Sequence, residues 1–258
     1  MEANIILGVY FSGTGNTKHC VETFVKEYDK DGIALSIESP NVIEKISAHD
    51  TIVFGYPIYF SNLPKMVRDF IDNNKDCFRN KKLYIIATMG LFSGDGTGCS
   101  ARLFQKYSAT ILGGLHLKMP DCIGDVKALK KSVKANQELI LQANKKIANA
   151  AIRLKEGHPH KEGLGFLYHM AGLFGQRLWF YGKATSYKQK PNIDAEKCIG
   201  CGRCNAVCPM KNFSIEDGKA VSHNQCTLCY RCFSQCPTKA LTILGKQVYE
   251  QCLFEKYR

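Results

Sequence analysis

Two cysteine runs near the C-terminus constrain this chain more than any other feature of its sequence. Each run reads Cys-x2-Cys-x2-Cys-x3-Cys-Pro, the first over residues 198–209 and the second over residues 226–237. Corresponding cysteines differ by 28 positions, so the two runs form an internal repeat. The repeat extends into three further pairs of residues: Lys211 with Lys239, Phe213 with Leu241 and Ile215 with Ile243.

This spacing is typical of cysteines that hold two [4Fe–4S] clusters. Three thiolates at such short intervals lie in one tight loop and reach three irons of a cubane, whereas the fourth cysteine, before the proline, ligates the companion cluster. The predicted metal ligands are Cys198, Cys201, Cys204 and Cys236 for one cluster, and Cys226, Cys229, Cys232 and Cys208 for the other.

Zinc is the main alternative for these runs, because Cys-x2-Cys pairs often bind it. A zinc site needs only four ligands and rarely contains a third cysteine at the same short interval. A disulfide framework is a weaker alternative, because the other cysteines are scattered and odd in number, which favours free thiols in a reducing compartment. These are Cys20, Cys77, Cys99, Cys122 and Cys252.

The remaining composition argues for a cytoplasmic protein without nucleic-acid or membrane partners. We see no basic leader segment and no run approaching about 18 apolar residues, so neither a signal peptide nor a membrane span is expected. The net charge of +12 is spread along the chain and accompanies no nucleic-acid-binding motif. Part of it would compensate anionic cofactors, and the rest would suit acidic redox protein partners.

The first 155 residues alternate between apolar runs and helical patterns, which predicts an α/β fold. Such alternation gives a doubly wound parallel sheet with helices on both faces, and ligands bind beyond the carboxyl ends of its strands. The predicted strands are 4–10, 33–37, 51–54, 83–88 and 110–117, and the clearest helical stretches are 65–74, 101–107 and 127–155.

A turn rich in hydroxyls and glycine follows the first predicted strand, over residues 12–17, and a helical pattern begins just after it. Backbone N–H groups, hydroxyls and the helix dipole bind phosphate in such a turn. It lacks the Gly-Lys-Ser/Thr ending of a nucleoside-triphosphate loop. It also lacks the third glycine of a dinucleotide fingerprint, because Lys18 stands at that position.

Two further loops, residues 56–64 and 89–98, follow the third and fourth predicted strands. They should therefore reach the same edge of the sheet as the phosphate turn. Their apolar and aromatic side chains, with glycines that permit close backbone approach, suit a flat isoalloxazine ring.

On these residues the chain resembles a flavodoxin over 4–155. With the cysteine runs, it resembles the flavodoxin–ferredoxin fusion proteins of anaerobic bacteria and archaea. The resemblance implies a five-stranded flavodoxin-like sheet with FMN, and a small α+β ferredoxin-like domain with two [4Fe–4S] clusters. The basic charge of residues 1–150 departs from the usual acidity of flavodoxins. The resemblance to flavodoxins also implies a phosphate site of Ser12, Gly13, Thr14, Gly15, Asn16 and Thr17. It implies a ring site of Pro57, Ile58, Tyr59, Phe60, Ser61, Asn62, Thr88, Met89, Gly90, Leu91, Phe92 and Gly94, with Tyr59 and Phe92 as candidates for stacking.

We predict three segments: a flavodoxin-like domain over 1–155, a basic aromatic connector over 156–191 and a ferredoxin-like domain over 192–258. The connector is interpreted as a bridge between the domains, with a membrane-surface helix or an exposed partner site as alternatives. Its apolar stripe consists of Leu164, Leu167, Ala171, Phe174 and Leu178, followed by Trp179, Phe180 and Tyr181.

Three smaller motifs have unremarkable explanations. The Gly-x-Gly-x-x-Ala pattern at 96–101 formally fits a nicotinamide-dinucleotide fingerprint, but it does not directly follow its strand. His158 and His160 are interpreted as part of a solvated turn rather than as a metal pair. Cys99 is interpreted as an inert small side chain near the flavin edge.

The leading functional hypothesis is electron transfer between two [4Fe–4S] clusters and FMN, which couples one-electron and two-electron redox partners. The alternative is a flavin-dependent reductase that receives electrons through the clusters and reduces a quinone, a nitro compound or a disulfide. A third possibility is a sensor that loses its clusters in oxygen. No catalytic residue is predicted, because Asp95 is the only ionisable residue in the second ring loop.

Overall fold

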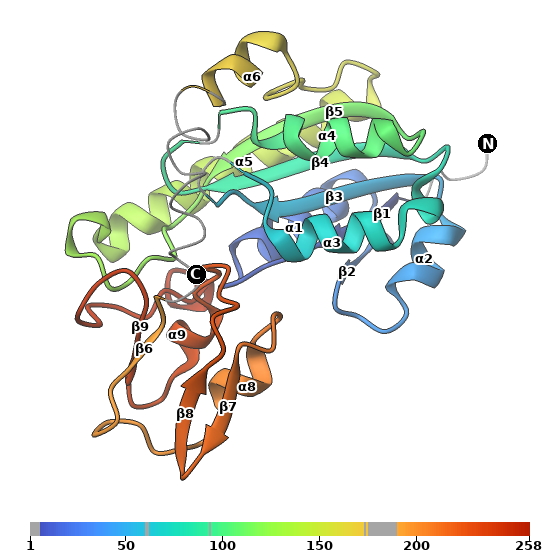
Figure 1. The fold of residues 1–258 in the computed structure, drawn as a ribbon. Coiled ribbons are helices and arrows are strands. Elements are labelled where there is room, and N and C mark those ends of the chain that lie inside the picture. The colour runs from blue at the N-terminus through green and yellow to red at the C-terminus, as the bar shows by residue number, and fades with distance from the viewer. Residues whose placement is uncertain (1–5, 60–61, 93, 173, 175–189) are drawn as a thin grey trace.

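The first domain is built on a five-stranded parallel sheet in the order β2-β1-β3-β4-β5 (Figure 1). The computed structural model describes residues 6–59, 62–92, 94–172, 174 and 190–258. This sheet confirms the predicted doubly wound, flavodoxin-like architecture. Its strands are β1 (Ile6–Tyr10), β2 (Ile33–Ser36), β3 (Thr51–Pro57), β4 (Lys82–Met89) and β5 (Thr110–Lys118).

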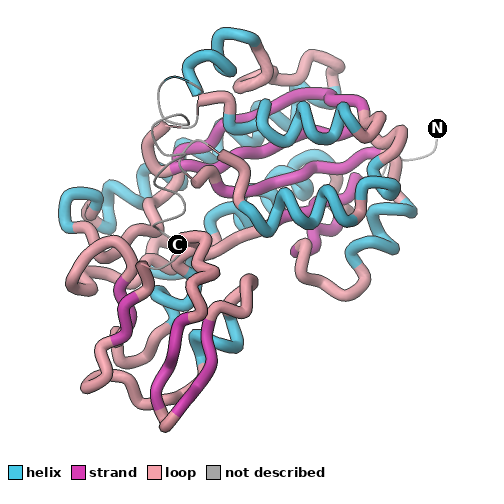
Figure 2. Tube along the Cα trace, in the orientation of Figure 1, coloured by secondary structure: helices cyan, strands magenta, loops and turns pink. Residues whose placement is uncertain are grey.

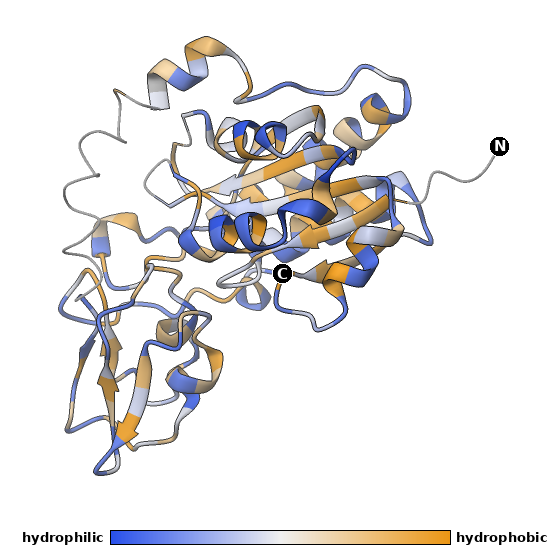
Figure 3. Cartoon of the chain, turned by 45° about the vertical axis from the view of Figure 1, so that its right-hand side comes forward, coloured by the Kyte–Doolittle hydropathy of each residue, from blue (hydrophilic) through white to orange (hydrophobic). Residues whose placement is uncertain are grey.

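Helices cover both faces of this sheet (Figure 2), which explains why its central strands are apolar on both sides. Helices α1 (Asn16–Tyr28) and α5 (Val133–Lys155) pack with alternate strand residues such as Val53 and Tyr84. The intervening residues, such as Phe54, pack on the other face under the remaining helices. Figure 3 shows the apolar residues concentrated along these strands. The covering helices on this second face are α2 (Val42–Ala48), α3 (Lys65–Asn73) and α4 (Gly96–Lys106).

Two helix starts differ from the sequence prediction, for local reasons. Helix α5 begins at Val133 rather than near Lys127, because the Ser132 Oγ accepts a hydrogen bond from the Ala135 N–H and caps the helix. Helix α4 begins at Gly96, earlier than predicted, so the pattern at 96–101 forms its first turns and is buried.

The second domain is a small α+β unit, drawn in orange and red in Figure 1. Its strands pair antiparallel, β6 with β9 and β7 with β8. Each cysteine run contributes one short helix, and the two helices contact each other. The elements are β6 (Asn192–Ile193), α8 (Arg203–Val207), β7 (Phe213–Glu216), β8 (Lys219–Ser222), α9 (Arg231–Gln235) and β9 (Leu241–Thr242).

The C-terminal tail of the second domain packs into the first. Phe254 and Tyr257 are buried in the core that α1 and α5 form with the sheet. The Phe254 ring stacks on His19 with centroids 4.4 Å apart, and the Phe254 N–H donates to the Thr14 carbonyl at 2.8 Å. The two domains are therefore joined by side-chain packing as well as by the connector.

In the described part of the connector, Leu164 packs against the core beneath α4, and helix α6 (Phe166–Gly172) contacts α4. Phe166, Leu167 and Phe174 are exposed. Leu178 and the aromatic run 179–181 lie outside the described residues. Within the described ranges, no helix combines the length and apolar character needed to cross a membrane.

Candidate functional site

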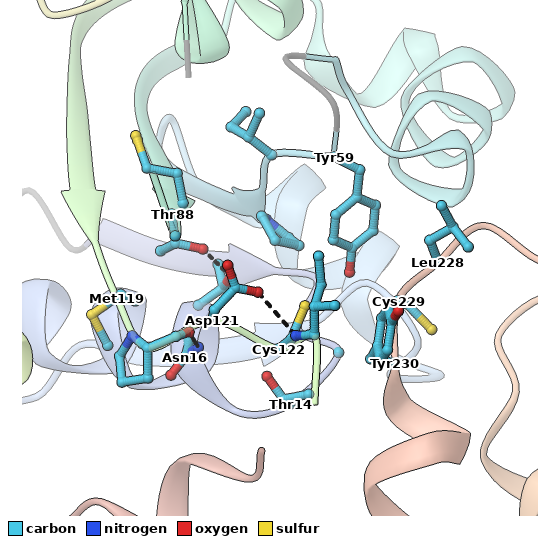
Figure 4. A pocket seen from close by; sticks show the side chains of 18 of the residues that line it. Thr14, Asn16, Tyr59, Thr88, Met119, Asp121, Cys122, Leu228, Cys229 and Tyr230 are labelled. Carbon is cyan, nitrogen blue, oxygen red and sulfur yellow. Dashed lines mark hydrogen bonds between the residues drawn. The ribbon is translucent and has the colours of Figure 1, made fainter. Parts of the chain in front are cut away.

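A cavity of about 320 Å³ lies at the carboxyl edge of the sheet, where the phosphate turn and the two ring loops meet (Figure 4). This volume is at the lower end of the range of ligand pockets. The predicted site residues that line it are Ser12, Gly13, Thr14, Asn16, Thr17, Pro57, Ile58, Tyr59, Thr88, Met89, Gly90, Leu91 and Phe92.

The phosphate turn is closed by its own hydroxyl. The Ser12 Oγ accepts a hydrogen bond from the Gly15 N–H at 3.1 Å, and Gly15 adopts a φ of 104°, which favours glycine. The 13-residue helix α1 starts directly after it, at Asn16. An anion at this point would meet backbone N–H groups and the positive end of the helix dipole.

The polar groups in the cavity wall fit a phosphorylated flavin. The buried Thr17 and Thr88 hydroxyls are 2.8 Å apart, and Thr14 is also buried. The Asn16 Nδ2 donates to the Pro120 carbonyl at 2.8 Å, whereas its Oδ1 is buried without a hydrogen-bond partner among the described residues. A buried polar atom of this kind calls for a donor from a ligand or water. No lysine or arginine lines the described wall.

The ring loops place aromatic and apolar groups on two sides of this cavity. Tyr59 is held by paired backbone hydrogen bonds with Asn62. Leu91 and Phe92 are 63% and 46% exposed at the rim, where a flat ligand would cover them. Gly15, Asn62 and Gly94, although predicted, are not in the lining, and Phe60 and Ser61 lie outside the described residues.

The loop after β5, which was not predicted to belong to the site, also lines the cavity. Asp121 accepts a hydrogen bond from the Ile123 N–H at 2.9 Å, and burial raises the pKa of its carboxyl. A Cβ on Gly90 would come within 2.4 Å of the Asp121 Oδ2, so these two loops touch. The end of a fifth parallel strand is the signal that points to this loop. The added residues are Met119, Pro120, Asp121, Cys122, Ile123 and, further on, Leu129.

The second domain supplies the remaining wall through Leu228, Cys229, Tyr230 and Leu244. Figure 4 shows Cys229 and Tyr230 on the same side of the cavity as Tyr59. A Cβ on Gly13 would lie 2.3 Å from the Cys229 carbonyl oxygen, so the phosphate turn and the second cysteine run are in direct backbone contact. No pattern in the sequence indicates this contact between the domains.

Four cysteines that were predicted as one ligand set lie around a common cavity. Cys198, Cys201, Cys204 and Cys236 line one small apolar cavity. In the other predicted set, burial raises the pKa of the Cys226, Cys229 and Cys232 thiols, and Cys208 adds a smaller rise.

Backbone N–H groups point at these sulfurs in a repeated pattern. The Asn212 N–H donates to the Cys208 Sγ at 3.4 Å, and the equivalent Ala240 N–H donates to the Cys236 Sγ at 3.3 Å. Such hydrogen bonds stabilise thiolates and tune bound clusters.

The number of cysteines in the two runs suggests two [4Fe–4S] clusters. Burial raises the pKa of Cys226 to about 12 and of Cys229 to about 11, so a bound metal has to displace these protons. Among the described residues, no three Cys, His, Asp or Glu side chains form a site for one metal ion. Eight thiols in two sets of four match two cubanes.

Comparison with known proteins matches two separate parts of the chain. A model of the flavodoxin domain matches residues 7–110, and a model of the 4Fe-4S dicluster domain matches residues 190–237. Ferredoxin-2 of Desulfomicrobium norvegicum is 52% identical over 29 residues, which are 11% of this chain and 49% of that protein. Ferredoxin-3 of Desulfocurvibacter africanus is 48% identical over 33 residues, which are 13% of this chain and 54% of that protein.

The chain thus spans about half the length of these curated relatives. Among solved structures, the two-electron reduced flavodoxin of Megasphaera elsdenii is 21% identical. Its match covers 57% of this chain and 100% of that one, with a TM-score of 0.41.

Proposed function

We propose that this chain, which joins an N-terminal flavodoxin domain to a C-terminal 4Fe-4S dicluster ferredoxin domain, couples one-electron and two-electron redox partners. The two domains together imply electron transfer; the flavodoxin domain suggests FMN, and the dicluster domain with its cysteines suggests two [4Fe–4S] clusters. A flavin exchanges one or two electrons, whereas a cubane exchanges one. The observation that carries the proposal is the cavity wall shared by the phosphate turn and the second cysteine run.

The residues of this chain have separable roles in the proposal. Ser12, Thr14 and Thr17, with the N-terminus of α1, would hold the phosphate, and the loops at Tyr59 and Phe92 would orient the ring and exclude water. The Asp121 carboxyl, whose pKa burial raises, would lie beside the ring-loop residue Gly90. The eight cysteines of the two runs would ligate the clusters.

The composition of the oxygen-free protein tests this proposal most directly. We expect about eight irons, eight sulfides and one FMN per chain, from the number of cysteine ligands and the phosphate turn at the first cavity. Stepwise reduction followed by EPR should then show both clusters and the flavin taking up electrons. Zinc in the cysteine sites, or a chain that binds no flavin under these conditions, would overturn it.

The partner that the charge favours is an acidic one-electron carrier protein. Residues 197–258 contain nine basic and four acidic residues, and Arg203 is exposed in the first cysteine run. Attraction between such a surface and an acidic carrier accelerates their encounter and weakens with salt. Cluster reduction by an acidic carrier that is no slower at high salt would remove this part of the proposal.

A second candidate function, reduction of a small acceptor, is favoured by an adjoining cavity of about 400 Å³. It shares Met89, Leu91 and Phe92 with the first cavity and is otherwise lined by residues such as His116 and Lys146. The two functions differ in one simple measurement. A reductase would turn over quinones, nitro compounds or disulfides when supplied with electrons, whereas a carrier would react only with other redox proteins.

A further inference from the structure

The two cysteine loops share one backbone conformation but differ in their side chains. In the first loop, Gly200 and Gly202 have φ angles of 66° and 71°. Their equivalents in the second loop, 28 positions later, are Leu228 and Tyr230, with φ angles of 61° and 57°. Glycine adopts this left-handed region freely, whereas leucine and tyrosine are strained there. The second loop therefore accepts strain that the first loop shows to be unnecessary for the backbone path.

The strained side chains form contacts with the first domain. Leu228 and Tyr230 both line the flavin cavity. The Tyr230 hydroxyl is buried and donates to the Asp125 Oδ1 at 2.9 Å. Asp125 lies in the segment after β5, and its Oδ2 accepts hydrogen bonds from the Ile243 and Leu244 N–H groups at 2.6 and 2.9 Å. Strain that persists at such a position is typical of a functional contact.

The next residue, Arg231, joins the second loop to the phosphate turn. Its guanidinium donates to both carboxylate oxygens of Glu38, at 2.8 and 2.7 Å, and to the Ser12 carbonyl at 2.8 Å. It also lies 5.2 Å from the centroid of the Phe11 ring. A bidentate pair of this kind fixes orientation as well as distance.

The equivalent positions of the first loop face solvent. Cys201 and Arg203 are exposed, and Ile199 is 65% exposed. By contrast Cys229, the equivalent of Cys201, is 7% exposed, and its carbonyl meets Gly13 of the phosphate turn. The repeat is thus symmetric in its cysteines and asymmetric in its surroundings.

We propose that the segment Leu228–Arg231 is a dedicated flavin-facing seam that gives the two clusters a fixed order. The inner cluster, on Cys208 and the second run, exchanges electrons with the flavin, and the outer cluster, on Cys236 and the first run, exchanges them with the external partner. Leu228, Tyr230 and Arg231 are positioning residues, because they hold the inner cluster loop against the cavity. This inference rests on the proposed function and adds the order of the cofactors.

The test compares three variants of the oxygen-free holoprotein. Arg231→Ala removes the ion pair with Glu38 and the hydrogen bond to the Ser12 carbonyl. The double variant Leu228→Gly, Tyr230→Gly gives the second loop the glycines of the first. Arg203→Ala is the matched control, since it removes the equivalent arginine of the outer loop. The first loop shows that glycine fits the backbone at both positions, but the double variant also leaves a cavity in the buried hydrophobic cluster around Phe233, so Arg231→Ala decides the test if the double variant loses iron.

Two measurements report on the seam. One is hydrogen exchange of the backbone amides in residues 12–17 and 228–231. The other is the rate at which the flavin is reduced after the clusters receive electrons from an external one-electron reductant. We expect both seam variants to speed the exchange and to slow flavin reduction by about tenfold or more, because a partly buried charge pair or a packed contact is lost. Arg203→Ala should leave both measurements unchanged when the reductant is a small molecule, because the exposed Arg203 is proposed to act only on the encounter with a protein carrier.

The outcomes separate this inference from the proposed function. Wild-type protein without clusters or flavin would refute the proposed function itself. If all three variants keep eight irons and one FMN and the seam variants match Arg203→Ala in both measurements, the proposed order of the cofactors is refuted and the proposed function stands. If one seam variant loses iron, the other seam variant decides the test, since Arg231 and the two loop residues contact different parts of the first domain.

Discussion

The proposed flavin site and the proposed cluster sites of this chain are built in opposite ways. Each set of four cysteines takes three members from one short run and one from the other run. The flavin cavity draws on the loops after four strands and on the second domain. A cluster site is therefore encoded almost within one segment, whereas the wall of the flavin cavity is completed by Leu228, Cys229, Tyr230 and Leu244 of the second domain.

This difference predicts which changes stay local. A change within the outer cysteine run should affect one cluster and leave the flavin in place. A change at the seam, or in the phosphate turn that it contacts, should affect flavin binding as well as the inner cluster. Each experiment below therefore pairs a seam variant with a control elsewhere in the chain.

The largest effect is expected from removal of one cysteine in each run. Cys229→Ser and Cys201→Ser should each lose one cluster, so that iron falls from about eight to about four per chain. Only Cys229→Ser should also weaken FMN binding, by tenfold or so on the scale of about 1.4 kcal/mol per decade, because Cys229 lines the cavity. Iron and sulfide analysis with an FMN titration measures both effects. Loss of flavin from Cys201→Ser would show that the outer cluster also supports the cavity.

Gly13→Ala should be the next most damaging change. The new Cβ would lie 2.3 Å from the Cys229 carbonyl oxygen, and no side-chain movement relieves a clash with backbone. Overpacking of this kind costs about 1–3 kcal/mol, which we expect to appear as weaker docking and weaker FMN binding. The control is Gly165→Ala, where the nearest atom, on Tyr168, is 3.7 Å away. Denaturant unfolding and FMN titration compare the two variants. An equal loss of stability and of FMN affinity in both would contradict the close contact between Gly13 and Cys229.

The same contrast explains what the sequence could predict. The alternation of apolar runs and helices predicted the sheet, because burial on both faces leaves a local pattern in strands such as β3. The spacing of the cysteine runs predicted the dicluster domain for the same reason. Both features depend on residues that are close together in the sequence, so a local sequence pattern is enough to predict them.

The missed parts of the site depend on contacts between distant segments. The residues that flank Leu228 and Tyr230 in the sequence do not indicate that these two residues line a cavity with Thr14. The only local trace is their departure from glycine in the repeat, which acquires meaning once their positive φ angles are known. Asp121 was within reach of prediction, because it follows the fifth strand at the edge where the other loops meet.

Tyr230→Phe tests a single hydrogen bond of the seam. Removing the hydroxyl leaves the buried Asp125 Oδ1 without this donor, which should lower the free energy of unfolding by about 1–3 kcal/mol. Tyr107→Phe is the control, since its hydroxyl donates to the Asp72 Oδ1 at 2.8 Å within the first domain, away from the seam. We expect only Tyr230→Phe to speed hydrogen exchange in residues 12–17. Identical exchange in the two variants would show that the Asp125 contact does not hold the phosphate turn.

The smallest effect should appear at the outer loop, where the protein meets its partner. Arg203 is exposed, so Arg203→Glu should leave stability and FMN binding nearly unchanged. It should slow electron transfer with an acidic carrier by severalfold at low salt, because rim charges act mainly on the association rate. The difference from wild type should shrink as salt is added, since ions screen exposed charges over about 10 Å at 0.1 M. Stopped-flow measurements at several salt concentrations test this. A deficit that persists at high salt would mean that Arg203 acts on the cluster itself, and the outer loop would then resemble the inner one.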